Sequence, residues 1–246
     1  MKFRRWQIFL GLSLVALSAF LYIIEYLIFG NVGSIAFYFF QDLAFVPIEV
    51  LLVTLIINNL LERRGKRLLL KKLNMVIGAF FSEVGTGLLK IFLDFIPRPE
   101  EIGKDLRVNG SWTHHNFETA SNRLRKMNYS IESKRGDLVS LKCFLVEKRI
   151  FLLRLLENPN LLEHDSFTEL LWAVFHLADE LDHRENLKDL PGPDFDHLSN
   201  DMKRACTLVI IEWLAYMYHL KNDYPYLFSL ALRNNPFDPD ATVIFR

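Results

Sequence analysis

Two long apolar stretches dominate the first quarter of the chain. The first, Ile8–Phe29, would form a helix about 33 Å long, which is enough to cross the hydrocarbon core of a bilayer. The second runs from Ile35 to Leu61, after the turn-forming segment Gly30–Ser34. The pattern predicts a transmembrane hairpin with spans of about 7–29 and 37–61. It leaves open whether residues 35–41 span, re-enter or lie at the interface.

The charged residues around the hairpin give its orientation. Lys2, Arg4 and Arg5 precede the first span, basic residues follow the second, and the connection carries none. Because basic residues stay on the cytoplasmic side, we expect both termini in the cytoplasm and the hairpin in the inner membrane. A cleaved signal peptide fits less well, since the apolar run continues ten residues past a candidate cleavage site at Ala16–Ala19.

The remainder of the chain has the pattern of a helical protein. Residues 65–96 form an amphipathic pattern that extends the second span or lies on the membrane surface, and Ile96–Glu101 breaks it. Further helical patterns are Asn116–Met127, Leu138–Leu156, Ser166–Glu185 with a Ser166/Glu169 capping box, Leu198–Leu220 and Tyr224–Leu232, with Pro191–Asp196 as a loop. The predicted fold is all-α: a two-helix transmembrane hairpin (1–64), a juxtamembrane amphipathic helix (65–96) and a cytosolic α-helical bundle (97–246).

Composition narrows the partners. Lysines plus arginines equal aspartates plus glutamates at 29 each, which argues against a nucleic-acid binder. The aromatic end of the chain, Tyr224–Pro239, is expected to close the core as a clasp or to pack on another subunit. Cys143 and Cys206 are expected to be buried free thiols in a reducing compartment, with a disulfide left open.

A basic cluster follows the second span. Its members are Arg63, Arg64, Lys66, Arg67, Lys71 and Lys72. It would suit anionic lipid headgroups, although the positive-inside rule alone explains it.

The second span carries two carboxylates, which are costly in hydrocarbon. Asp42 and Glu49 lie seven residues apart, so they share one helical stripe. In a ring of subunits the acids would form two cation-selecting rings, with Val53 or Ile56 as an apolar constriction and Asn59 as an inner polar ring. In the alternative interpretation Asp42 lies among headgroups, and Glu49 is neutral or bonded to Ser13 or Ser18.

A second polar cluster has the residue types of a metal site. His176, Asp179, Glu180 and His183 lie at i, i+3, i+4 and i+7 of one predicted helix. His114, His115 and His197 are further ligands, but nothing in the sequence brings them near. A solvated helix face would show the same pattern.

Motifs for enzymatic chemistry are missing from the sequence, which has no phosphate-binding glycine loop and no nucleophile elbow. We therefore expect no enzyme activity and no cofactor. The Gly85–Gly87 segment is expected to be a close-packing or kink site within a helix.

Two resemblances follow from these residues. Asp42, Pro47 and Glu49 resemble the acids and proline at the pore mouth of mitochondrial calcium uniporters, although the uniporter acids lie one turn apart and follow a tryptophan. Leu60–Lys90 and His219–Pro239 are similar to an uncharacterised family of small prokaryotic membrane proteins. That similarity implies two spans plus a cytosolic helical domain, and it carries no assigned activity.

These observations predict a homo-oligomeric integral membrane protein, with the bilayer, other copies of itself and cations as partners. The leading hypothesis is a cation-preferring pore with a cytosolic regulatory domain. The alternative is a membrane-anchored interaction or sensory module without transport. A metal-dependent activity of the cytosolic domain ranks third.

Overall fold

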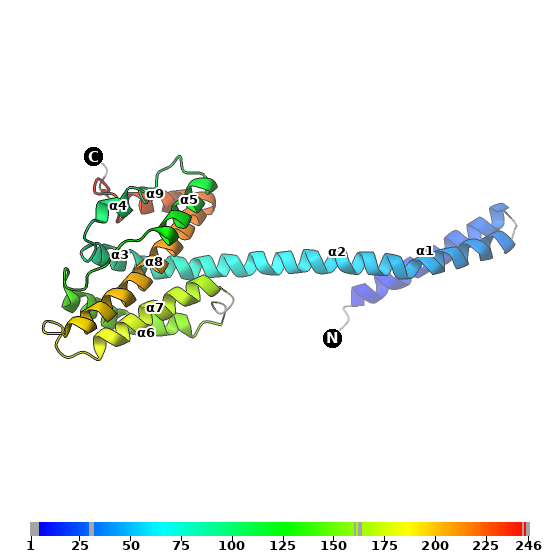
Figure 1. The fold of residues 1–246 in the computed structure, drawn as a ribbon. Coiled ribbons are helices and arrows are strands. Elements are labelled where there is room, and N and C mark those ends of the chain that lie inside the picture. Colours follow the sequence, from blue (N-terminus) through cyan, green and yellow to red (C-terminus); the bar gives the residue numbers. More distant parts are fainter. Residues whose placement is uncertain (1–4, 30–31, 160, 162–163, 243, 245–246) are drawn as a thin grey trace. The chain divides into compact units, whose positions relative to one another are not determined.

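The computed structural model describes the chain except residues 1–4, 30–31, 160, 162–163, 243 and 245–246. Within the described residues the secondary structure is helical throughout, which confirms the predicted all-α fold (Figure 1). The chain divides into two units, Met1–Lys66 and Arg67–Arg246.

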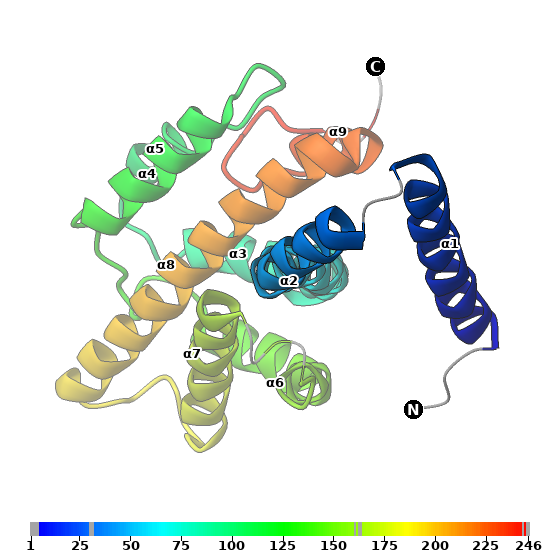
Figure 2. The same cartoon turned by 90° about the vertical axis from the view of Figure 1, so that its right-hand side faces the viewer.

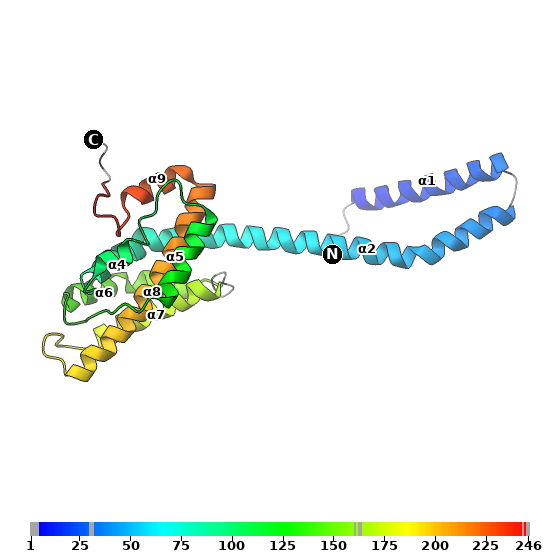
Figure 3. The ribbon, with the colours of Figure 1, turned by 45° about the horizontal axis from the view of Figure 1, so that its top comes forward.

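The first unit is a helical hairpin. It contains α1 (Arg5–Phe29) and the first part of α2 (Val32–Phe80), which run antiparallel (Figure 3). The rings of Tyr22 on α1 and Phe39 on α2 meet edge to face, with centroids 6.5 Å apart. The apolar side chains described here are largely exposed, including Leu27 and Leu51. Contact between the two helices therefore leaves most of the hairpin's apolar surface uncovered.

The second unit is built around a buried apolar segment of the chain. This segment comprises the end of α2, a π-helical turn η1 (Phe81–Gly85) and α3 (Thr86–Leu93). The Phe81 ring stacks on Tyr216, with centroids 5.0 Å apart, and Phe80 packs edge to face on Phe167 at 5.4 Å. A Cβ added at Gly85 would lie 2.5 Å from the Phe81 ring, so only glycine fits there. This confirms the expected close packing at the glycine pair.

The other helices surround this segment. They are α4 (Pro99–Gly103), α5 (His114–Lys126), α6 (Leu138–Leu156), α7 (Asp165–Asp182), α8 (Gly192–Asp223) and α9 (Pro225–Arg233). Helix α8 is the longest of this group and contacts α3, α5, α7 and α9 (Figures 1 and 2). Helix α7 lies between α6 and α8. The α7–α8 contact sets the position of the polar cluster considered below.

The end of the chain closes the core, as the clasp interpretation predicts. Phe228 of α9 and Phe237 beyond it are buried, and the Phe237 ring packs edge to face on Trp213 at 5.3 Å. The buried Asn235 donates a hydrogen bond from its side chain to the backbone carbonyl of Leu106 (3.1 Å). A polar group inside the core thus has its partner.

Three local predictions were wrong. Helix α7 has no Ser166/Glu169 capping box: it begins after His164, whose Nδ1 accepts a hydrogen bond from the N–H of Phe167 (3.2 Å). The predicted loop Pro191–Asp196 is mostly the first turn of α8, because proline fits the start of a helix. Cys143 is exposed, and only Cys206 is a buried thiol.

One of the two alternatives predicted for the amphipathic segment 65–96 agrees with the structure, because α2 continues without a break to Phe80 and so extends the second apolar stretch. The segment's apolar residues, such as Leu73, Leu88 and Phe92, are almost fully buried in the core of the second unit. The structure therefore joins this segment to the helical domain that was predicted to begin at residue 97. Its apolar face is covered by protein and does not lie open to a membrane surface.

Candidate functional site

The acidic stripe of the predicted second span lies on the exposed surface of α2. Asp42 and Glu49 are both exposed, and so are Val53, Ile56 and Asn59. On an ideal helix Asn59 falls about 100° round the axis from Asp42, so it lies at the edge of that face. A single copy of the hairpin therefore leaves both acids on its surface.

The basic cluster lies just beyond this stripe on the same helix. Arg64 is exposed. The side chains of its other members, Arg63, Lys66, Arg67, Lys71 and Lys72, lie outside the described residues. Their predicted contact with lipid headgroups stays a prediction.

The predicted metal ligands are divided by the structure. His176 and Glu180 of α7 face α8, where they meet His197 and Asp201. Asp201 Oδ2 lies 3.5 Å from His176 Nε2 and 3.2 Å from His197 Nε2. Glu180 lies 3.8 Å from His176 Nε2 through Oε1 and 3.6 Å from His197 Nε2 through Oε2. We call these four residues the α7–α8 cluster.

Arg184 forms hydrogen bonds with Glu180 of the α7–α8 cluster and with Asp194 beside it. Its Nη1 donates to Glu180 Oε2 (2.7 Å), and its Nη2 and Nε donate to the two Asp194 oxygens (2.6 and 2.9 Å). These hydrogen bonds from Arg184 lower the pKa of both Glu180 and Asp194. The planar guanidinium therefore ties the end of α7 to the first turn of α8.

Asp179 and His183 point elsewhere. Asp179 accepts a hydrogen bond from Arg149 Nη2 of α6 (3.1 Å), so it belongs to the opposite contact of α7. His183 is the C-cap residue directly after α7, and its Nδ1 lies 2.7 Å from the backbone carbonyl oxygen of Asp179. The helical spacing placed all four residues on one broad face, but α6 and α8 share that face.

Two of the four residues in the α7–α8 cluster, His197 and Asp201, are missing from the set of ligands that the sequence predicts on a single helix. The sequence suggests His197 only as a distant further ligand, and it does not single out Asp201. A repeated spacing is the signal that could have found them, since His176/Glu180 and His197/Asp201 are both i, i+4 pairs. Two such pairs on consecutive helices joined by a short connection face each other in an antiparallel helix pair.

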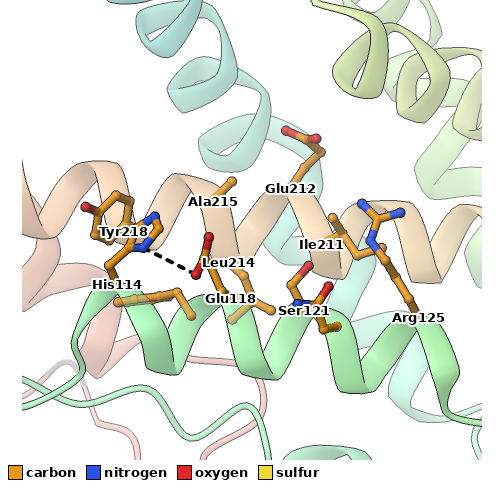
Figure 4. Close-up of a pocket in the computed structure, with 11 residues that line it drawn as sticks. His114, Glu118, Ser121, Arg125, Ile211, Glu212, Leu214, Ala215 and Tyr218 are labelled. Carbon is orange, nitrogen blue, oxygen red and sulfur yellow. Dashed lines mark ion pairs between the residues drawn. The ribbon is translucent and has the colours of Figure 1, made fainter.

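A groove between α5 and α8 is the second candidate site (Figure 4). Its volume is about 400 Å³. At one end His114 Nδ1 lies 3.5 Å from Glu118 Oε2, and the His114 ring packs edge to face on Tyr218, with centroids 4.9 Å apart. Arg125 lies at the other end, and Ile211 contributes to the apolar lining (Figure 4).

Glu212 gives this groove its most unusual feature. The residue is only 4% exposed, yet it lines the groove. Among the described residues we find no hydrogen bond or ion pair to its carboxylate. Acids are seldom this deeply placed in a folded protein, and this one lies where a pocket opens. No motif in the sequence distinguishes Glu212 from the apolar residues around it.

Comparisons with known proteins agree on one relationship. The family model described as "MJ1433, N-terminal helical domain" matches residues 2–61, and "Uncharacterized protein MJ1433, C-terminal helical domain" matches residues 69–233. The chain is 49% identical over 244 residues to uncharacterized protein MJ1433 of Methanocaldococcus jannaschii, in a match that covers 99% of this chain and 98% of the relative. No solved structure matches. The gap between the two matches coincides with the boundary between the two units.

Proposed function

We propose a function from the premise that this chain belongs to the family of the uncharacterised protein MJ1433 and contains both of its helical domains. The chain is an integral membrane protein of the inner membrane. Its hairpin anchors the helical domain at the cytoplasmic face, where the domain acts as an interaction or sensory module.

One observation carries the membrane part of this proposal. The stretch Phe37–Leu61 has a mean hydropathy of 2.0, and none of its described side chains is buried inside the protein. An exposed apolar surface of that length is far larger than the patches that soluble proteins leave open to water. A bilayer removes this surface from water at little cost in backbone hydrogen bonds, because the segment is one continuous helix in which Pro47 alone lacks a backbone N–H.

The sensory part is supported by the α5–α8 groove. Its volume of about 400 Å³ falls in the range of small-molecule sites. It combines an apolar lining with charged groups at both ends. This arrangement suits a small amphipathic ligand with a cationic group that pairs with Glu118.

The exposed thiol of Cys143 allows a direct test of orientation. Cys143 lies on α6 in the helical domain, whereas Cys206 is buried. A membrane-impermeant maleimide should label Cys143 in inside-out vesicles and leave it unlabelled in right-side-out vesicles. The Cys143→Ala chain is the control and should stay unlabelled in both. Labelling in right-side-out vesicles, or release of the protein from membranes by alkaline washing, would contradict the proposal.

A cation-preferring pore is the second candidate function, because Asp42 and Glu49 share one exposed stripe of the same helix. Acids within a span usually face other protein or a water path, so this stripe favours association of several copies. The mass of the intact protein in lipid nanodiscs tests this first. A ring of four or more subunits supports a central path, whereas a monomer or dimer leaves no room for one.

Ion flux in proteoliposomes then tests the acids themselves. Glu49→Gln should reduce cation flux because it removes one charge from each subunit of the ring. Glu132→Gln, an exposed site of the helical domain, is the matched control and should leave flux unchanged. Unchanged flux in Glu49→Gln would remove the pore and leave the anchored module.

A further inference from the structure

We propose that the α7–α8 cluster, His176, Glu180, His197 and Asp201, binds one divalent transition-metal ion of the zinc type and clasps α7 to α8. This inference goes beyond the anchored module and does not depend on it. The cluster lies within the second unit, and its metal binding is measured independently of membrane orientation. Four features support the site: the distances between donor atoms, the state of Asp201, the donor chemistry and the contacts of Arg184.

The donor atoms converge on a common point. His176, His197 and Asp201 each offer one ligand atom, and the three atoms lie within 4.8 Å of one another. Zinc bonded to nitrogen or oxygen at its usual length requires neighbouring ligand atoms about 3.3–3.4 Å apart in a tetrahedron. The distances from Asp201 Oδ2 to the two Nε2 atoms, 3.5 and 3.2 Å, are close to that edge.

Asp201 is the residue that sets this cluster apart from an ordinary surface cluster. Its Oδ2 atom is shielded from solvent and accepts no hydrogen bond from the described part of the protein. Both imidazoles approach this oxygen, but neither meets it in hydrogen-bonding geometry. Buried polar atoms without a partner are rare in native proteins, and a bound ion satisfies such an atom directly.

The donor set also selects the class of metal. Two imidazole nitrogens and two carboxylate oxygens suit borderline cations such as zinc. Calcium and magnesium prefer sites made wholly of oxygen, and copper(I) prefers thiolates and thioethers. The two positive charges of the ion would offset the two carboxylates that the cluster brings together.

Arg184 provides the outer support that metal sites usually have. It donates to Glu180 Oε2 and so fixes this carboxylate with Oε1 left toward His176. It also donates a hydrogen bond to Asp194 in the first turn of α8, the helix that carries His197 and Asp201. Partners of this kind orient ligands, and their loss typically lowers metal affinity about 10–100-fold.

The cluster is accessible to an ion. His176 and His197 each keep about half of their side-chain surface exposed, at 51%. A hollow of about 180 Å³, lined by Trp172, His176, Asp201 and Arg204 among others, opens beside them. The imidazoles can therefore adjust to an ion without any change in the packed core.

The test uses the full chain without an affinity tag, stripped of metal by a chelator and held in lipid nanodiscs. Calorimetric titration with Zn²⁺ should give one site per chain, and Co²⁺ should give the visible absorption of tetrahedral nitrogen and oxygen coordination. His197→Ala and Asp201→Asn should each weaken binding at least about 100-fold, and Arg184→Gln should weaken it about 10–100-fold as a positioning residue.

Two matched controls lie on the same helix or at its end. His183→Ala and Asp179→Asn change the same residue types outside the α7–α8 cluster. Both variants should bind Zn²⁺ with an affinity within about threefold of that of the unchanged chain, because neither residue contacts the donor atoms. Circular dichroism checks that every variant remains helical, and Zn²⁺ should raise Tm for the unchanged chain and for His183→Ala but not for His197→Ala. Absence of a stoichiometric site, or equal losses in His183→Ala and His197→Ala, would overturn the proposal.

Discussion

Residues Phe37–Leu61 and Leu73–Leu93 are both helical, apolar and long enough to cross a bilayer. Their mean hydropathies are 2.0 and 1.6, so composition alone barely separates them. Their surroundings differ sharply. None of the described side chains of the first stretch is buried, whereas 44% of an 18-residue window of the second is buried, where η1 and α3 pack on α8.

The comparison shows how similar apolar stretches can have different functions. In the second stretch charged residues such as Glu83 and Lys90 interrupt the pattern and stay exposed, while the apolar face packs in a protein core. In the first stretch the apolar residues surround the helix on all sides, so no face is reserved for a core. A helix that is apolar all round needs lipid or other helices, and a helix with one apolar face needs a bundle.

The largest expected difference between the two stretches comes from truncating one leucine in each. Leu88→Ala empties a fully buried site and should lower the free energy of unfolding of the helical domain by about 2–5 kcal/mol. Leu51→Ala changes a side chain that is 58% exposed in the hairpin and should leave that domain unaffected. Denaturant unfolding followed by circular dichroism in a mild detergent measures both. Equal effects would mean that the hairpin is part of the same cooperative core.

A pair of glycines sharpens the same contrast with a smaller effect. Gly85→Ala forces a methyl group against the packed Phe81 and Phe80 rings and should cost about 1–3 kcal/mol. At Gly65, within α2, a Cβ would meet nothing within 4 Å. Gly65→Ala should stabilise its helix by up to about 1 kcal/mol, because alanine favours helices. Thermal unfolding compares the two, and a harmless Gly85→Ala would contradict the tight packing of the π-helical turn.

Buried acids provide a third comparison, with an effect of opposite sign. Glu212→Leu replaces an acid that is only 4% exposed and lies among apolar residues of α8, and it should stabilise the helical domain by about 0.5–2 kcal/mol. Glu118→Leu in the same groove replaces an exposed acid and should change stability little. Thermal unfolding measures both variants. Destabilisation by Glu212→Leu would show that the carboxylate has a stabilising partner.

The smallest effect is a dependence on alkaline pH that arises from two buried groups of the helical domain. Burial raises the pKa of Cys206 from 9.0 to about 12 and also raises the pKa of Tyr129, whose hydroxyl lies 2.6 Å from Thr207 Oγ1. The folded state favours the neutral forms of Cys206 and Tyr129. Their contribution to the free energy of unfolding is therefore complete below about pH 9 and is lost as pH rises towards 12. The loss is at most about 1.4 kcal/mol per pH unit for each group.

A variant pair isolates this effect. Cys206→Ala with Tyr129→Phe should flatten the decline between about pH 8 and 10.5, while Cys143→Ala should leave it unchanged because that thiol is exposed. Unfolding curves at several pH values give the slope. A decline that persists in the double variant would assign it to other groups.

Helix positions were largely predictable from the sequence because they depend on local periodicity. Leu138–Leu156 agrees with α6 at both ends. The local errors had two causes: at α7 a tertiary contact replaced a local capping signal, and at residues 191–196 a local signal for a helix start was interpreted as a loop. Glu169 lies 3.8 Å from Arg204 of α8 and does not cap α7, and the prolines at the 191–196 segment start a helix where a loop was expected.

The candidate site was predictable only in part, because it depends on a tertiary contact between two helices. His176 and Glu180 were recognisable from their spacing on one helix. Their partners His197 and Asp201 come from the next helix, and only the packing of α7 on α8 brings them within reach. Glu212 gave no signal, because a single acid in an apolar helix resembles a surface residue until its burial is known.

The central claim is that Phe37–Leu61 lies in lipid, whereas Leu73–Leu93 belongs to the core of a helical domain that is surrounded by water. Spin labels at two positions test this claim. In the Cys143→Ala chain, one label is placed at Leu51 and the other at Met75, which is 65% exposed on the second stretch. Collision with oxygen reports lipid, and collision with a water-soluble nickel complex reports water.

The account predicts that in nanodiscs the label at Leu51 collides mainly with oxygen and the label at Met75 mainly with the nickel complex. Accessibility of Leu51 to the nickel complex, equal to that of Met75, would show that the hairpin is not in the bilayer. In that case the assignment of Phe37–Leu61 as a membrane span would be wrong.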